Sequence, residues 1–89
     1  MAKKRRKLNK DFERKIYSSK KNVELVLAKI YDIDDEDIQK EYMGAFNRVV
    51  YLYDELQEDY ELQGFSENSE ELLTNYKNAF NFFESEFEI

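Results

Sequence analysis

The stretch IQKEYMGAFNRVVYLYDELQEDYEL, residues 38–62, carries large side chains at alternating spacings of four and three residues. This repeat places them on one stripe of an α-helix, and the two-residue period of a β-strand cannot produce it. At a rise of about 1.5 Å per residue, such a helix is roughly 37 Å long. So long an apolar stripe needs neighbouring segments to cover it. The stripe consists of Tyr42, Phe46, Val49, Tyr53, Leu56 and Tyr60.

The segment before this stretch predicts a helix over residues 9–31. Asn9 is its expected N-cap, and apolar residues recur along one face after it. Lys20 stands where the repeat calls for an apolar side chain. We therefore expect a bend or an interruption near residues 18–22, with Ser18 or Ser19 capping the second part.

The connectors predict the remaining helix ends. Residues 32–37 are acidic, and Asp34 is the expected cap of a second helix over residues 35–62. Gly64 can supply the left-handed residue that commonly ends a helix. Ser66 or Asn68 can then begin a third helix over residues 67–87. Gly44, inside the second helix, would permit close approach of a neighbouring backbone.

The overall composition predicts an all-α protein. There is no Pro and there are only two Gly, which favours long helices, while seven Phe and seven Tyr supply large apolar faces. Because short connectors fold helices back on one another, we expect a small antiparallel three-helix bundle at residues 9–89, preceded by a basic arm at residues 1–8. The alternative is a hairpin of the second and third helices, with the first swung away or used for dimerisation.

Charge is distributed unevenly along the chain. Residues 1–21 hold ten of the fourteen Lys and Arg residues and two acids, whereas residues 22–89 hold four basic residues and eighteen acids. A basic head on an acidic body is the main functional signal, because it suggests charged partners.

Most catalytic chemistry lacks its usual residues. There is no His and no Cys, so the commonest general base and the strongest nucleophile are missing. The two glycines are too far apart for a phosphate loop. The acidic connector fails the calcium-loop pattern, because an EF-hand counted from Asp32 would need Gly at position 37 and Glu at position 43. We expect no enzyme activity, no cofactor and no metal.

The basic residues predict contact with nucleic acid. Lys10, Arg14 and Ser18 are spaced four apart, so one face of the first helix can follow a phosphate backbone. No residue set indicates base reading, so the contact would be non-specific. The alternatives are a solvated arm, an arm folded against the chain's own acids, or an anionic membrane surface, for which the first helix lacks a suitable apolar face. The candidate residues are Lys3, Lys4, Arg5, Arg6, Lys7, Lys10, Arg14 and Lys15.

The acidic residues predict a basic protein partner. They crowd the C-terminal ends of the second and third helices, where they oppose the helix dipole. Charges kept against helix stability suggest selection for binding, and carboxylates along a helical rod can imitate phosphates, as in DNA mimics. The alternative is that these acids serve only to keep the protein soluble. The candidate residues are Tyr51, Asp54, Glu55, Glu58, Asp59, Glu61, Glu84, Glu86 and Glu88.

In its small size, acidity, aromatic-rich helices and missing catalytic groups, the chain resembles phage- or plasmid-encoded inhibitors, anti-CRISPR proteins among them. This resemblance is one of composition, and it implies an inhibitor or regulator. We expect a cytoplasmic location, because the absence of Cys fits a reducing compartment. Abundant Lys, Asn, Ile, Tyr and Phe suit a low-GC bacterium or its phage.

The leading hypothesis is a non-catalytic helical protein that docks on a nucleic-acid-handling protein or nucleoprotein complex, away from membranes. The alternative is a homodimeric interaction module without nucleic acid, in which the stripe of residues 42–60 is buried across a two-fold axis.

Overall fold

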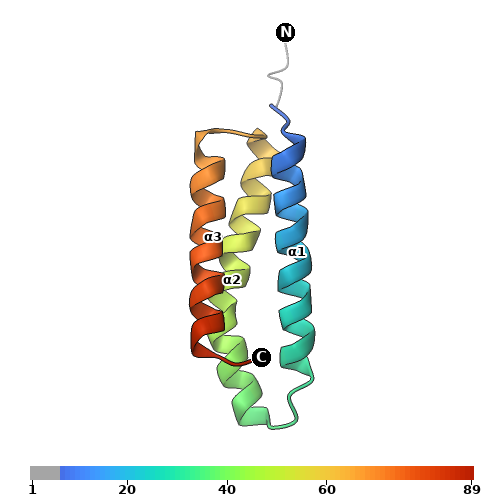
Figure 1. Cartoon of the computed structure of the whole chain (residues 1–89), viewed down its shortest axis with the longest axis vertical. Coiled ribbons are helices and arrows are strands. Elements are labelled where there is room, and N and C mark those ends of the chain that lie inside the picture. Colours follow the sequence, from blue (N-terminus) through green and yellow to red (C-terminus); the bar gives the residue numbers. More distant parts are fainter. Residues whose placement is uncertain (1–6) are drawn as a thin grey trace.

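The computed structural model describes residues 7–89, which fold into three helices (Figure 1). They are α1 (Lys10–Tyr31), α2 (Glu36–Gln63) and α3 (Glu67–Glu86). Successive helices run antiparallel, and α2 packs against both α1 and α3, which touch each other far less. This confirms the expected all-α three-helix bundle. Residues 3–6 of the basic arm lie outside the described part of the chain.

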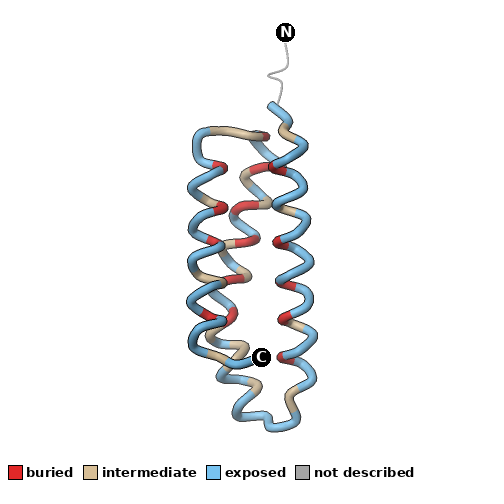
Figure 2. The backbone as a smooth tube through the Cα atoms, in the orientation of Figure 1, coloured by how far each residue is buried: buried red, intermediate tan, exposed pale blue. Residues whose placement is uncertain are grey.

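The repeat in α2 forms the centre of the bundle. Phe46, Val49, Tyr53, Leu56 and Tyr60 are all buried, while Tyr42, nearer the start of α2, is half-buried. Figure 2 shows buried positions of all three helices turned toward one another. Because α1 and α3 cover this stripe within one chain, no second copy is needed to bury it.

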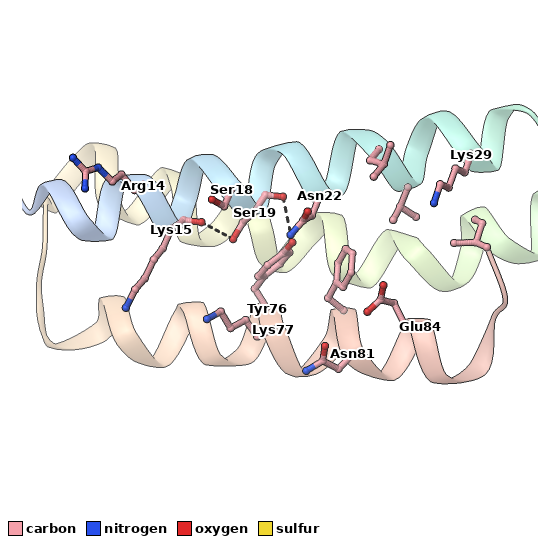
Figure 3. Close-up of a pocket in the computed structure, with 14 residues that line it drawn as sticks. Arg14, Lys15, Ser18, Ser19, Asn22, Lys29, Tyr76, Lys77, Asn81 and Glu84 are labelled. Carbon is pink, nitrogen blue, oxygen red and sulfur yellow. Dashed lines mark hydrogen bonds between the residues drawn. The ribbon is translucent and has the colours of Figure 1, made fainter.

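α1 is unbroken from Lys10 to Tyr31, so the bend or interruption expected at residues 18–22 does not form. Ser19 is the reason: it is buried, and its Oγ donates a hydrogen bond to the Lys15 carbonyl at 2.8 Å. The Tyr76 hydroxyl from α3 donates to the Ser19 carbonyl at 3.2 Å (Figure 3). A small polar residue thus takes the core position in this turn, and Lys20 stays exposed.

Side-chain caps start α1 and α2. The Asn9 Oδ1 accepts from the Phe12 N–H at 3.0 Å, as expected. At α2 the cap is Asp35 rather than the expected Asp34: its Oδ1 accepts from the N–H groups of Asp37 at 2.9 Å and Ile38 at 3.1 Å. Asp35 thus satisfies two of the N–H groups in the first turn of α2 that have no partner within the helix.

The α2–α3 connection turns at Gly64, whose φ of 73° is left-handed. The Gly64 N–H donates to the Tyr60 carbonyl at 2.8 Å, which ends α2 as expected. The next N–H, from Phe65, donates to the Lys7 carbonyl at 2.6 Å, so the start of the described chain is fixed against this turn. Ser66 then begins α3.

Aromatic side chains join α2 to α3. The rings of Phe46 and Phe83 lie 4.8 Å apart, centroid to centroid, and those of Tyr53 and Tyr76 lie 6.0 Å apart, both edge-on. Gly44 does not take part: a Cβ added there would meet nothing within 4 Å, so the expected close backbone approach is absent.

Candidate functional site

The outer side of α2 presents an acidic face, which we define as Tyr51, Asp54, Glu55, Glu58, Asp59 and Leu62. These residues line one shallow hollow. All of them except Asp59 are exposed, on the side of α2 away from its buried stripe, whereas Asp59 is half-buried. Tyr51 is 64% exposed and Leu62 is 70% exposed. Carboxylates between two exposed apolar side chains make a surface suited to a partner that offers both positive charge and apolar contact.

No ion pair with another described residue neutralises Asp54, Glu55 or Glu58. Two neighbouring carboxylates of α2 accept hydrogen bonds from side-chain amides: the Gln57 Nε2 donates to the Glu61 Oε1 at 3.2 Å, and the Gln63 Nε2 donates to the Asp59 Oδ1 at 3.1 Å. The negative charge of this face also affects a buried tyrosine. Burial raises the pKa of the Tyr53 hydroxyl, and the neighbouring Asp54 carboxylate adds to that shift.

The second acidic group, Glu84, Glu86 and Glu88, lies elsewhere. The Glu88 carbonyl accepts a hydrogen bond from the Tyr42 hydroxyl at 3.3 Å, near the start of α2. Nineteen residues separate Tyr42 from Glu61, which is about 28 Å along α2. Each acidic group lies at the C-terminal end of its own helix. Because α3 runs antiparallel to α2, these two ends are at opposite ends of the bundle, and the two groups do not form one surface.

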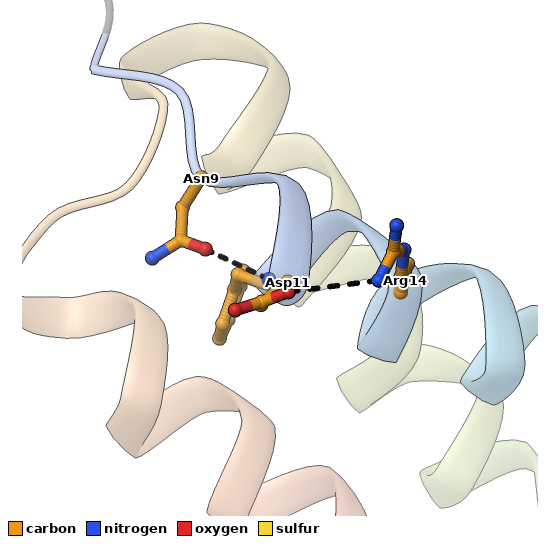
Figure 4. Close-up of polar contacts among 4 residues, drawn as sticks. Asn9, Asp11 and Arg14 are labelled. Atoms are coloured by element: carbon orange, nitrogen blue, oxygen red, sulfur yellow. Dashed lines mark hydrogen bonds and ion pairs between the residues drawn. The ribbon is translucent and has the colours of Figure 1, made fainter.

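The basic residues of α1 divide between two sides of that helix. Lys10 and Arg14 share an outer hollow with Tyr17 and Ser18, as the four-residue spacing predicts, and the acid Glu13 also lines this hollow. The Arg14 Nη1 lies 3.8 Å from the Asp11 Oδ1, and both side chains are exposed (Figure 4), so this ion pair adds little stability and leaves Arg14 able to bind elsewhere. Lys15 instead extends from α1 toward α3.

Sequence reasoning counted Lys21 among the cations but missed the aromatic residue of this outer face of α1, Tyr17. Tyr17 is 58% exposed, and the Lys21 ammonium lies 5.3 Å from the centre of its ring, in cation–π range. An aromatic ring among cations is the combination that stacks on nucleic-acid bases. Tyr17 follows Arg14 by three residues and precedes Lys21 by four. This helical spacing places the ring between two cations on one side of α1, and it could have been recognised in the sequence.

Tyr60, from the buried stripe, joins the end of α2 to the start of α1. Its hydroxyl donates to the Glu13 Oε2 at 2.6 Å and accepts from the Asn9 N–H at 3.0 Å. The basic start of α1 therefore lies beside the acidic end of α2. Lys7 also lies at this end: it is exposed, and its backbone bridges to Gly64.

The described carboxylates form no group of three or more that could hold a metal ion. Among residues 7–89, no helix is both long and apolar enough to cross a membrane.

The fold and these surfaces define an all-α three-helix bundle with oppositely charged outer faces at one end. Comparison of the chain with protein-family models, with curated proteins and with solved structures finds no match.

Proposed function

We propose that this protein is a non-catalytic binding protein that docks on a nucleic-acid-handling protein or nucleoprotein complex and regulates or inhibits it. One observation carries the proposal: the acidic face of α2 and the basic outer face of α1 lie at the same end of the bundle, where Tyr60 holds the two helices together. The acidic face binds a basic protein surface, and the basic face contacts phosphate.

The density of charge on α2 supports the first contact. Five acids lie between Asp54 and Glu61, which span about 10 Å of helix axis. That is about one negative charge per 2 Å, and duplex DNA carries one per ~1.7 Å. A basic groove that binds nucleic acid would meet a similar charge on α2. Occupying that groove would exclude nucleic acid from it, which is a direct route to inhibition.

The outer face of α1 supports the second contact. Lys10 and Arg14 are exposed at one helical turn's separation, and Tyr17 adds a ring on which a base can stack. The arm residues at positions 3–6 would extend this face along the phosphate backbone. They lie outside the described residues, so their part in the proposal rests on sequence alone.

A pull-down from a low-GC bacterial lysate, with nuclease present, tests the acidic face. The bait is compared with the variant Asp54→Asn/Glu55→Gln/Glu58→Gln. A matched control, Glu84→Gln/Glu86→Gln/Glu88→Gln, removes the same charge at the other end. We expect a nuclease-resistant partner that the control retains, that the α2 variant loses, and that duplex DNA displaces. A partner retained equally by all three baits would contradict the proposal.

Binding of a labelled DNA duplex at several salt concentrations tests the basic face. Each phosphate contact contributes about 0.9 to the slope of log K against log salt. Replacing the five basic residues 3–7 with Gln should therefore weaken binding and flatten the slope by as much as about 4.5. The variant Lys40→Gln/Arg48→Gln, which removes cations of the acidic body, serves as control. An unchanged slope in the arm variant would exclude phosphate contact by the arm.

A further inference from the structure

A groove of about 600 Å³ lies between α1 and α3, on the side of the bundle away from the acidic face of α2 (Figure 3). Apolar side chains contributed by both helices line it, chiefly Leu25, Val26, Tyr76 and Phe80, together with Ile89 after α3. Leu25 is 56% exposed although it stands next to a buried core residue. Because α1 and α3 make few contacts with each other, Leu25, Phe80 and Ile89 keep apolar surface accessible in the groove, beside the buried Val26 and Tyr76.

The rim of the groove is basic, unlike the rest of the acidic body. Lys15 and Lys29 rise from α1 and Lys77 rises from α3, so cations stand on both walls. Residues 22–89 contain only four basic residues, and two of them, Lys29 and Lys77, are here. None of the three lysines is ion-paired with another described residue. Glu84 is the one acid among the residues that line the groove.

The groove has the length of a short helix. Lys15 and Lys29 are fourteen residues apart, which is about 21 Å, or four helical turns. A helix laid there would contact α1 and α3 and complete a four-helix bundle. Its apolar stripe would cover Leu25 and Phe80, and acids flanking that stripe would meet the lysines.

We propose that this groove binds an acidic amphipathic helix of a partner protein as a fourth helix of the bundle. Charge complementarity identifies the occupant: a cationic rim selects acids, and an apolar floor selects a helix with an apolar stripe. A nucleic-acid backbone would satisfy the rim but leave the floor uncovered. This binding surface is distinct from the acidic face of α2 and does not depend on the function proposed for that face.

A second copy of this chain is a poorer occupant. Its only described surface of matching chemistry is the acidic face of α2, which lies on the opposite side of the molecule from the groove. Seating that face in a neighbour's groove would leave one groove and one face open, so association would continue as an open chain instead of closing as a dimer.

The probe is a fluorescein-labelled peptide of about 15 residues, four helical turns, with Leu on one stripe and Glu elsewhere. A matched peptide carries Lys in place of Glu. Fluorescence anisotropy with the full chain should show micromolar binding of the Glu peptide and binding of the Lys peptide at least about tenfold weaker. Equal affinity for both peptides, or no binding up to about 200 µM, would overturn the proposal.

Variants locate the binding. Lys15→Glu/Lys77→Glu should weaken the Glu peptide by about tenfold or more, and Glu84→Gln should strengthen it. The control Lys40→Glu/Arg48→Glu makes the same change in net charge outside the groove and should leave affinity unchanged. Equal losses in both double variants would mean unspecific attraction and would overturn the proposal. Circular dichroism of each variant, together with the milder Lys15→Gln/Lys77→Gln pair, separates lost binding from lost folding.

Two further outcomes would assign the groove to another occupant. Concentration-dependent self-association in sedimentation, lost in Lys15→Glu/Lys77→Glu, would make a second copy the occupant. Binding of a labelled DNA duplex that depends on Lys15 and Lys77, without binding of the Glu peptide, would make it a phosphate-binding groove. Either result overturns the proposal of an acidic helix.

Discussion

Replacing Phe46 by Ala tests the core directly. Phe46 has no exposed surface, and its ring lies 4.8 Å from that of Phe83 and 6.1 Å from that of Phe80, centroid to centroid. The substitution therefore removes both the buried apolar surface of a large ring and two edge-on ring contacts between α2 and α3. The truncated side chain would leave a cavity between α2 and α3.

The expected cost is large relative to the stability of the whole chain. A buried Phe→Ala change costs about 3–5 kcal/mol, which includes the lost transfer free energy and the cavity. A chain of 89 residues has a total unfolding free energy of about 4–13 kcal/mol. The variant should therefore lose about a quarter or more of its stability and can lose all of it.

Urea unfolding followed by far-ultraviolet circular dichroism measures this loss. Phe82→Ala is the matched control, because Phe82 is the same residue type on α3 but is 66% exposed. We expect the control to change the unfolding free energy by less than about 0.5 kcal/mol. The slope of free energy against urea should be unchanged in both variants, since both unfold the same bundle.

Two results would contradict this description of the core. A loss below about 1 kcal/mol for Phe46→Ala would mean that the ring is not enclosed between α2 and α3. Equal losses for the two variants would mean that α3 is rotated about its axis relative to the packing described above.

Two other substitutions follow from single features of the fold. Gly44→Ala should stabilise the chain by about 0.5–1 kcal/mol, because a Cβ at this helical position meets nothing and Ala has the higher helix propensity; a destabilised variant in the same urea assay would contradict the open space at this site. Burial raises the pKa of Tyr76 to about 12, so between pH 10 and 12 the folded chain holds a proton that the unfolded chain releases, and stability should fall by about 2–3 kcal/mol as pH rises through this window. Tyr76→Phe should flatten this part of the pH profile, and an unchanged profile would show that Tyr76 ionises equally in both states.

Features that depend on local spacing could be predicted from the amino-acid sequence alone. The alternation of four and three residues placed Phe46, Val49 and Leu56 in the core, because a helix brings residues at these spacings to one side. The same periodicity placed Asp54, Glu55 and Glu58 together on the opposite, exposed side. The capping residue Asn9 and the turn at Gly64 also followed from local chemistry, since each satisfies backbone groups within a few residues of itself.

How these local features combine depends on contacts between the helices, which local spacing does not predict. Ser19 is helical and buried because its carbonyl accepts a hydrogen bond from Tyr76, fifty-seven residues away, and no local rule includes that partner. The antiparallel course of α3 separates Glu84–Glu88 from the acidic face of α2, and the placement of α1 beside α3 turns Lys15 into the groove. Helical periodicity fixes which residues share a side of one helix. Which side meets another helix, and which side stays open, depends on packing between segments distant in sequence.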